Sequence, residues 1–384
     1  MRIYLDNAAT TMVCREAAKV ALHVMTADFG NPSSTHKMGR DAKRILEESR
    51  AKIASSLGAE PHEIFFTSGG TESNNWALLS GAGFYAKRYS GKHIISSQAE
   101  HVTVLKALEI LERRGFEVTR LRPEKDGSIL ADAVIDALRE DTILVSLLAV
   151  NNETGGVTDI KAVSRGIKQK GSAAILHTDA VQAFQKIPFS AKTVGFDLIS
   201  ISGHKIHAPK GVGVLYIRGG GNAVKLPPLI VGGYQESKMR AGTEALPQIA
   251  AFATAAELAD KLFDTSRDKM AALKEHIIKR LSAENDGLLS VLCGEAPHII
   301  SIALPGYKSE VMMNFLEARG IYVSKGSACK KGSRSSVLEA CGHSGAVIDG
   351  ALRIGISRYT TQEEADAFCD GIREARQSLY PSLR

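Results

Sequence analysis

The chain has 384 residues and a formal net charge of +6, from 48 basic and 42 acidic side chains. With 44% hydrophobic and 23% charged residues, the composition is that of a folded protein of about two domains, which argues against a disordered chain. The basic residues are scattered along the chain rather than gathered in blocks, so direct nucleic-acid binding is not expected.

The N-terminal residues MRIYLDNAATT lack the apolar core of a secretory signal, and the longest apolar run, Ile143 to Val150, is too short to cross a bilayer. The five cysteines are widely spaced, without a CxxC pair: Cys14, Cys293, Cys329, Cys341 and Cys369. An odd number of scattered thiols indicates a reducing compartment rather than a disulfide framework. We therefore expect a cytoplasmic protein with no membrane partner.

Helical and strand-like segments alternate through the first 200 residues. Strands are expected at 63–68, 92–98, 116–122, 142–150, 173–180 and 197–202. Helices are expected at 41–57, 76–89, 103–115 and 160–170, with a short one near Val181. Strands separated by helices of this length predict βαβ units and a mainly parallel central sheet.

The pattern changes after about residue 255. A long helical stretch at 250–283 is followed by the strand-like segment HIISIALPG and, at 362–378, by a final helix. These elements predict a smaller α/β domain. We expect a large domain at 15–255 and a small one at 256–384, with residues 1–14 packed on the small domain.

Polar clusters follow or end five of the predicted strands. They are Ser68-Gly69-Gly70-Thr71, Glu100-His101, Asn151-Asn152-Glu153, His177-Thr178-Asp179 and Ser202-Gly203-His204-Lys205. In an open parallel sheet, ligands bind beyond the carboxyl ends of the strands. The five clusters are therefore predicted to meet at one rim and form one site.

The chemistry of these clusters favours a phosphorylated aldehyde cofactor. Gly69-Gly70-Thr71 at the start of a helix suits a phosphate, although a simple helix cap is the alternative reading. Asp179 and Lys205 end neighbouring strands, which suits pyridoxal 5′-phosphate (PLP), because the lysine binds its aldehyde and the aspartate its pyridinium nitrogen. A structural ion pair between the two side chains is the competing explanation. Dinucleotide and nucleoside-triphosphate sites lack support, since neither glycine signature occurs where those sites need it.

The same segments carry a family resemblance that covers essentially the whole chain. The matching motifs are YLDNAATT, TSGGTESNN, VNNETG, HTDAVQAFQKIP, SGHKIHAPKGVG, RAGTE, SKGSAC and LRIGISRYTT. In these motifs the chain resembles the cysteine desulfurases, which are PLP enzymes of the class V aminotransferase group. The resemblance implies the PLP-dependent transferase fold (fold type I), and SKGSAC in a long loop resembles the iron–sulfur-cluster and nitrogen-fixation branch.

The resemblance also implies a role for each matching residue. Lys205 would attach PLP covalently, and His101 would stack on its ring and move protons. The phosphate would be bound by Gly70, Thr71, Ser202 and His204 and, across a dimer interface, by Thr243. Asp179 would bind the pyridine nitrogen, and Gln182 would bind the phenolic oxygen. Asn152 and Arg353 would bind the substrate carboxylate.

Cys329 would be the nucleophile of the implied reaction, which converts L-cysteine to L-alanine and leaves a persulfide on this thiol. The sulfur would then pass to a protein acceptor such as an iron–sulfur scaffold, and the enzyme would be a homodimer. The basic residues near Cys329 in the sequence are Lys325, Lys330, Lys331 and Arg334, and no acidic residue occurs between 324 and 336. This local excess of positive charge should favour the thiolate of Cys329.

Other readings stay open. A selenocysteine lyase or another class V aminotransferase would share these motifs, and a catalytically inactive scaffold could bind a sulfur acceptor. No metal is expected, because His204 with His207, or Cys341 with His343, makes no complete ligand set. The segment GGYQESKMRAGTE departs from the family pattern, with Tyr234 and Ser237-Lys238 where glycine and Arg-Gly are common, which questions the contact made by Thr243.

Overall fold

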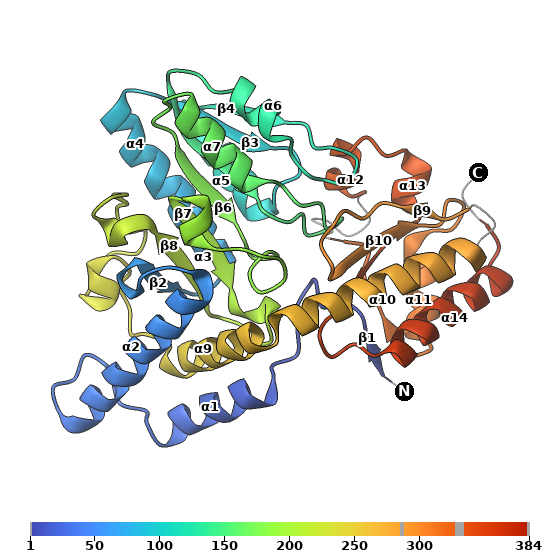
Figure 1. Cartoon of the computed structure of the whole chain (residues 1–384), viewed down its shortest axis with the longest axis horizontal. Coiled ribbons are helices and arrows are strands. Elements are labelled where there is room, and N and C mark those ends of the chain that lie inside the picture. The colour runs from blue at the N-terminus through green and yellow to red at the C-terminus, as the bar shows by residue number, and fades with distance from the viewer. Residues whose placement is uncertain (1, 285–287, 327–333, 382–384) are drawn as a thin grey trace.

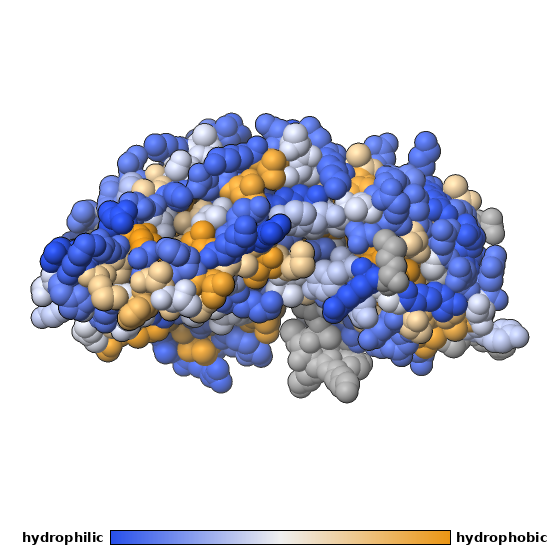
Figure 2. All heavy atoms as spheres, turned by 90° about the horizontal axis from the view of Figure 1, so that it is seen from below, coloured by the Kyte–Doolittle hydropathy of each residue, from blue (hydrophilic) through white to orange (hydrophobic). Residues whose placement is uncertain are grey.

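A computed structural model of the chain describes residues 2–284, 288–326 and 334–381. Figure 1 shows a larger part built around one sheet, a smaller part around a second sheet, and the helices α9 and α10 passing along both. Hydrophilic side chains cover most of the face seen from below, with apolar ones scattered between them (Figure 2).

The larger sheet has seven strands in the order β2-β8-β7-β6-β5-β3-β4. The strands are β2 (Ile64–Thr67), β3 (His93–Ser97), β4 (Glu117–Leu121), β5 (Thr142–Leu148), β6 (Ile175–Asp179), β7 (Leu198–Ser202) and β8 (Gly213–Ile217). Strand β8 is antiparallel to both its neighbours, and the other described pairings are parallel. The prediction of a mainly parallel sheet is confirmed, although β8 was not predicted.

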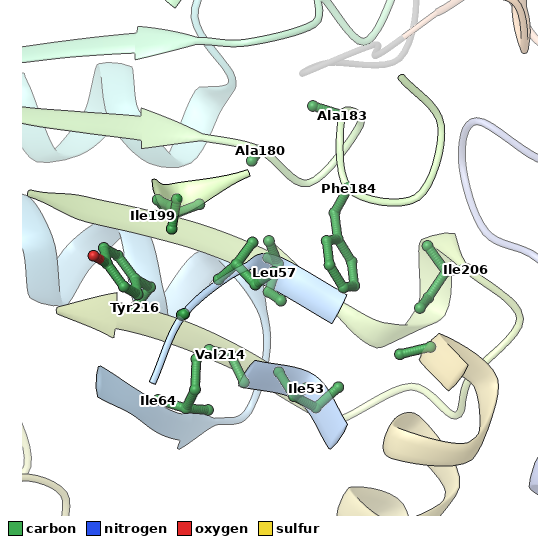
Figure 3. Close-up of a cluster of buried hydrophobic side chains, with 14 of the residues drawn as sticks. Ile53, Leu57, Ile64, Ala180, Ala183, Phe184, Ile199, Ile206, Val214 and Tyr216 are labelled. Atoms are coloured by element: carbon green, nitrogen blue, oxygen red, sulfur yellow. The ribbon is translucent and has the colours of Figure 1, made fainter. Parts of the chain in front are cut away.

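Helices cover both faces of this sheet, which explains why β5 is buried along its whole length. On one face lie α1 (Arg15–Thr26), α2 (Lys37–Leu57), α6 (Ala131–Asp136), α7 (Ile160–Gln169) and α9 (Leu246–Lys261). On the other lie α4 (Gly81–Tyr89) and α5 (Val102–Arg113). Figure 3 shows Ile53 and Leu57 of α2 packed among Ile64, Ile199 and Val214 of the strands.

Two predicted helices differ in detail from the structure. The helix expected at 76–89 consists of a π-helical turn (Trp76–Ser80) and α4, and it directly follows another helix, α3 (Gly70–Asn75). The π turn carries the fully buried Trp76, whose indole N–H donates to the Pro227 carbonyl at 2.8 Å. The short helix expected near Val181 is wrong, because residues 181–186 form turns and the helical turn α8 (Ala191–Val194) comes later.

The smaller part has a three-stranded antiparallel sheet in the order β12-β10-β9. Its strands are β9 (Ser290–Val291), β10 (Ile299–Ala303) and β12 (Ala351–Gly355), and its helices are α10 (Phe263–Glu284), α11 (Ser309–Glu317), α12 (Ser336–Ala340), α13 (Gly345–Asp349) and α14 (Gln362–Ser378). The strand and the final helix predicted here are confirmed. Near the N-terminus, β1 (Ile3–Tyr4) pairs in parallel with β11 (Ile321–Tyr322).

The predicted long helix is interrupted at Leu262, between α9 and α10. Buried side chains of α9 belong to the core of the larger sheet, whereas those of α10 pack with β10, β12 and α14 in a second core. We propose that the border between two domains lies at this interruption. Among the described helices, none has both the length and the apolarity needed to cross a bilayer.

Candidate active site

A cavity of about 410 Å³ lies beyond the carboxyl ends of the parallel strands. All five polar clusters identified in the sequence contribute to its wall. The predicted residues that line it are Gly70, Thr71, His101, Asn152, Asp179, Gln182, Ser202, His204, Lys205 and Arg353. The structure therefore brings ten residues, spread over almost 300 positions, to one place.

Three further residues named from the sequence have different outcomes. Thr243 is exposed and lies outside the cavity. Cys329 falls within 327–333, outside the described residues. His177 lies inside the sheet, where its ring nitrogens contact the hydroxyls of Ser146 at 2.9 Å and Ser200 at 3.0 Å. Burial lowers the pKa of His177 to about 3, so it is a neutral core residue rather than part of the rim.

Lys205 follows β7 and its amine points to the N-terminal segment. The Nζ atom donates to the carbonyl oxygens of Ala8 and Ala9, both at 2.7 Å. Burial lowers the pKa of Lys205 to about 8, with a further contribution from the nearby Arg353. A lysine with such a pKa has an appreciable neutral fraction near neutrality, which nucleophilic attack on an aldehyde requires.

Asp179 ends β6, next to β7, and both its carboxylate oxygens accept hydrogen bonds. Asn74 Nδ2 donates to Oδ2 at 2.6 Å, and the Val181 backbone N–H donates to Oδ1 at 3.0 Å. Asp179 and Lys205 therefore bond to other groups in the described structure and not to each other. The rim ion pair considered from the sequence is not observed, and the carboxylate is held in one orientation at the cavity wall.

His101 caps the N-terminus of α5. Its Nδ1 accepts from the Thr103 N–H at 3.3 Å and lies 2.8 Å from the Thr103 hydroxyl. Burial lowers the pKa of His101, and the positive charge of Lys205 acts in the same direction, while Asp179 opposes both. The neutral imidazole is therefore favoured, with its ring at the cavity wall.

Residues 8–10 contact three of the predicted cofactor-binding side chains. Besides holding Lys205, the Ala8 carbonyl accepts from Gln182 Nε2 at 2.8 Å. Thr10 Oγ1 lies 3.2 Å from Nδ1 of His204, whose pKa burial lowers to about 4. The sequence reasoning gave these residues no role, although the motif YLDNAATT marked the segment.

One end of the cavity suits a phosphate. Gly69 has a φ of 148°, in the region that favours glycine, and a Cβ on Gly70 would come within 2.8 Å of Val181 Cγ2. The first turn of α3, with Gly70 and Thr71, lines the cavity together with Ser202 and His204. Backbone N–H groups with hydroxyl and imidazole donors are the groups that bind a phosphate dianion.

The other end suits a carboxylate. The Arg353 guanidinium donates to the Asn152 carbonyl at 2.9 Å and to Asp6 Oδ1 at 3.0 Å. Arg353 Nε and Asn152 Oδ1 are buried and have no hydrogen-bond partner within the described residues. Buried polar groups without partners are costly. Arg353 Nε can donate to a carboxylate, whereas Asn152 Oδ1 needs a donor, so this arrangement favours a ligand that carries both a carboxylate and an N–H group.

Acidic side chains from other parts of the chain contact the described residues on either side of 327–333. Lys325 pairs with Glu310 at 2.6 Å, and Arg334 pairs with Asp349 at 2.6 Å. Glu153 accepts from the Ser335 hydroxyl at 2.5 Å. Two of the four basic residues counted in the sequence are therefore paired with carboxylates that the local sequence lacks, and the effect on Cys329 stays a prediction.

The comparisons with known proteins agree with this geometry. The family described as Aminotransferase class-V matches residues 3–368. The chain is 41% identical to Cysteine desulfurase IscS of Methanosarcina thermophila, over 98% of this chain and 92% of that protein. It is 39% identical to Cysteine desulfurase IscS of Dictyoglomus turgidum, over 98% of this chain and 95% of that protein.

Solved structures give the same answer for the fold. A NifS-like protein superposes with a TM-score of 0.92 at 36% identity, covering 99% of this chain and all of that one. The structure titled "SspA in complex with cysteine" superposes with a TM-score of 0.81 at 32% identity, over 94% of this chain and all of that one. The protein is thus a PLP-dependent enzyme of fold type I.

Within that class, the chain belongs to the class V aminotransferase family, in the group of the cysteine desulfurases. PLP is the cofactor of this family, and the residues of the cavity fit it. The buried amine of Lys205 suits the aldehyde of PLP, and the oriented carboxylate of Asp179 suits its ring nitrogen. The glycine-rich start of α3 suits the phosphate, and the two buried polar atoms without partners suit a bound substrate.

Proposed function

We propose that this enzyme converts L-cysteine to L-alanine and passes the sulfur through a persulfide on Cys329. The observation that carries the proposal is the single cavity in which Lys205, Asp179 and Arg353 meet. Support comes from relatives named cysteine desulfurases and from the SspA structure, whose title names bound cysteine.

In this proposal, each wall of the cavity binds one part of the cofactor. Lys205 attaches the aldehyde carbon, and Asp179 binds the ring nitrogen. Gly70, Thr71, Ser202 and His204 bind the phosphate, Gln182 binds the phenolic oxygen, and His101 covers the ring. When bound, PLP draws electrons away from the Cα of an attached amino acid.

The remaining residues bind the substrate and move its protons. Arg353 and Asn152 hold the carboxylate of L-cysteine, which fixes the Cα–H bond relative to Lys205. A neutral Lys205 amine can accept that proton, since its pKa of about 8 lies close to the working pH. Neutral His101 is a second group able to accept or donate a proton.

The sulfur step balances without an outside oxidant or reductant. The Cys329 thiolate attacks the substrate sulfur, so a sulfur–sulfur bond forms while the carbon–sulfur bond breaks. The bonding electrons stay on the substrate carbon, which takes up a proton and becomes the methyl group of alanine. The carbon is reduced and the two sulfurs of the persulfide are oxidised.

We also propose a cytoplasmic homodimer that delivers sulfur to a protein acceptor, such as an iron–sulfur scaffold. Support for the dimer comes from apolar side chains exposed on and around α1 and on the segment 229–234, including Phe29 at 65%, Val231 at 78% and Tyr234 at 81%. Apolar patches interrupt the polar surface on the part of the face in Figure 2 that carries α1 and α2. A partner subunit here would bring its Thr243 to the cavity.

The test is the reaction itself, in wild type and in the variants Lys205→Ala and Cys329→Ala. Purified wild type should show the visible absorbance of bound PLP and form equal amounts of alanine and transferable sulfur from L-cysteine. Lys205→Ala should lose turnover, and Cys329→Ala should bind cysteine spectrally but release no sulfur. Sulfur release by Cys329→Ala at the wild-type rate would reject the thiol's role and favour a selenocysteine-lyase-like reaction.

A further inference from the structure

A buried histidine contacts one of the cofactor-binding side chains from behind. His298 immediately precedes β10 of the smaller sheet and is 2% exposed. Its Nε2 atom lies 3.1 Å from Oε1 of Gln182, which follows β6 of the larger sheet. Gln182 lines the cavity, whereas His298 does not. The contact therefore joins the two sheets of the molecule directly behind the cavity wall.

The neighbours of Gln182 fix the direction of each hydrogen bond. The Ala8 carbonyl can only accept, so the Gln182 atom 2.8 Å away from it must be the amide nitrogen. The amide oxygen then faces His298, and because this oxygen can only accept, His298 Nε2 must carry the proton. The other nitrogen, Nδ1, is buried and has no partner in the described residues, which fits a ring atom without a proton.

The surroundings of His298 keep it neutral. Burial lowers its pKa well below the ordinary value, and the charges of Lys186, Lys274, Lys205 and Arg353 act in the same direction. A neutral imidazole has one N–H group. That single donor is committed to Gln182, so the pair keeps one arrangement over the pH range in which the enzyme works.

We infer that His298 is a positioning residue, which holds the Gln182 amide so that its second N–H faces the phenolic oxygen of the cofactor. Ala8 fixes one end of the amide and His298 fixes the other. Held by Ala8 alone, the amide can pivot about a single hydrogen bond, and its N–H then spends less time directed into the cavity. This inference rests on the proposed contact between Gln182 and PLP.

The effect can be measured without any turnover. A donor to the phenolic oxygen stabilises its ionised form, so losing the donor raises the apparent pKa at which the visible absorbance of bound PLP changes. We expect His298→Leu to raise this apparent pKa by about one unit, which corresponds to one hydrogen bond to a charged group. His298→Gln should restore the wild-type value, because its side-chain N–H can replace that of the imidazole.

A double-mutant comparison separates a positioning role from a merely structural one. Gln182→Met should raise the apparent pKa of the absorbance change by at least as much as His298→Leu does. The double variant, with both substitutions, should have the same apparent pKa as Gln182→Met alone. His298→Met serves as a second variant without a donor, with a side chain long enough to fill the space. A lower thermal midpoint in both variants without a donor, with no shift of the absorbance titration, would overturn the inference.

Failure of the proposed function would look different. If Gln182→Met leaves the absorbance titration unchanged, Gln182 does not contact the phenolic oxygen, and the cofactor arrangement proposed above is wrong. If Gln182→Met shifts the titration but both His298→Leu and His298→Met do not, the arrangement stands and only the role of His298 is rejected.

Discussion

Burial sets the charge of several side chains behind the cavity. It lowers the pKa of Lys186 to about 7 and that of His207 to about 3. For Lys186 the positive charges of Arg358 and Lys205 add to the effect. Lys186 is 6% exposed, so the free energy of keeping it charged inside the protein is large enough to be measured.

The Lys186→Met substitution should therefore stabilise the protein in a pH-dependent way. In the unfolded chain the lysine keeps its ordinary pKa of 10.5, so between pH 7 and 10.5 the unfolded state binds one proton more than the folded state. Wild-type stability then rises with pH by about 1.4 kcal/mol per unit from this group, and the variant lacks this rise. Thermal unfolding between pH 6.5 and 9.5 should show the advantage of the variant shrinking as pH rises, and a constant difference would contradict the account.

Arg353 should not tolerate replacement by lysine. Its two terminal nitrogens bond to Asn152 and Asp6 in a fixed fork, which an ammonium group cannot reproduce. Losing the equivalent of two charge-assisted hydrogen bonds predicts roughly a hundredfold lower kcat/KM for L-cysteine in Arg353→Lys. Arg358→Lys, outside the cavity, is the matched control. Steady-state alanine formation measures both. Wild-type activity in Arg353→Lys would show that the positive charge alone is sufficient and would contradict the account.

Most side chains of the site could be predicted from the sequence, but the groups that hold them in place could not. Asp179, Lys205 and Asn152 could be found because a charged or amide group at the end of a predicted strand is unusual, whereas Arg353, in the middle of β12, was identified only through the family resemblance. Ala8 contributes a backbone carbonyl, which has no signature in the sequence. His298 looks like any packing histidine until the fold places it against Gln182.

The segment of Glu236, Ser237 and Lys238 illustrates how an element can be held in a strained form. All three residues have positive φ angles, 47°, 57° and 68°, and at Lys238 the family pattern commonly has glycine. Arg50 of α2 binds both oxygens of Glu236, at 2.7 and 2.8 Å, and the Phe66 N–H donates to the same carboxylate at 2.8 Å. These bonds fix the segment that leads to Thr243.

The Arg50→Met substitution should destabilise this segment strongly. It leaves the Glu236 carboxylate, 2% exposed, buried without its partner, which predicts a loss of about 3–5 kcal/mol in the free energy of unfolding. The double variant Arg50→Met, Glu236→Gln should recover part of the lost free energy of unfolding, because it no longer has an unpaired buried carboxylate. Thermal unfolding and hydrogen exchange of residues 234–244 test this. An Arg50→Met protein as stable as wild type would show that the ion pair does not hold the segment.

Regular elements were predicted where their pattern was local. The continuous apolar run of β5 and the final helix α14 needed no tertiary information. β8 was missed because its five residues follow a glycine-rich turn directly after the lysine motif. The pairs of Lys325 with Glu310 and Arg334 with Asp349 could not be seen, since each carboxylate lies 15 positions away and only folding brings it close.

At the scale of the whole molecule, the proposed homodimer would cover the apolar side chains exposed on the segment 229–234. Replacing both Val231 and Tyr234 by aspartate should prevent dimer formation, because it places four charges in a symmetric interface. Leu130→Asp, at a leucine exposed to 57% before α6, is the matched control. Light scattering at several concentrations should give a monomer for the double variant only. A dimer that persists in the double variant would place the interface elsewhere.

The central claim is that the sulfur of L-cysteine passes through a persulfide on Cys329. Mass spectrometry of the protein after a brief exposure to L-cysteine tests this claim most directly. We predict a gain of one sulfur atom on the peptide that carries Cys329, reversed by a thiol reductant and absent in Lys205→Ala. Cys14, Cys293, Cys341 and Cys369 should stay unmodified. Sulfur on any of these four with none on Cys329, while alanine is still formed, would contradict the account.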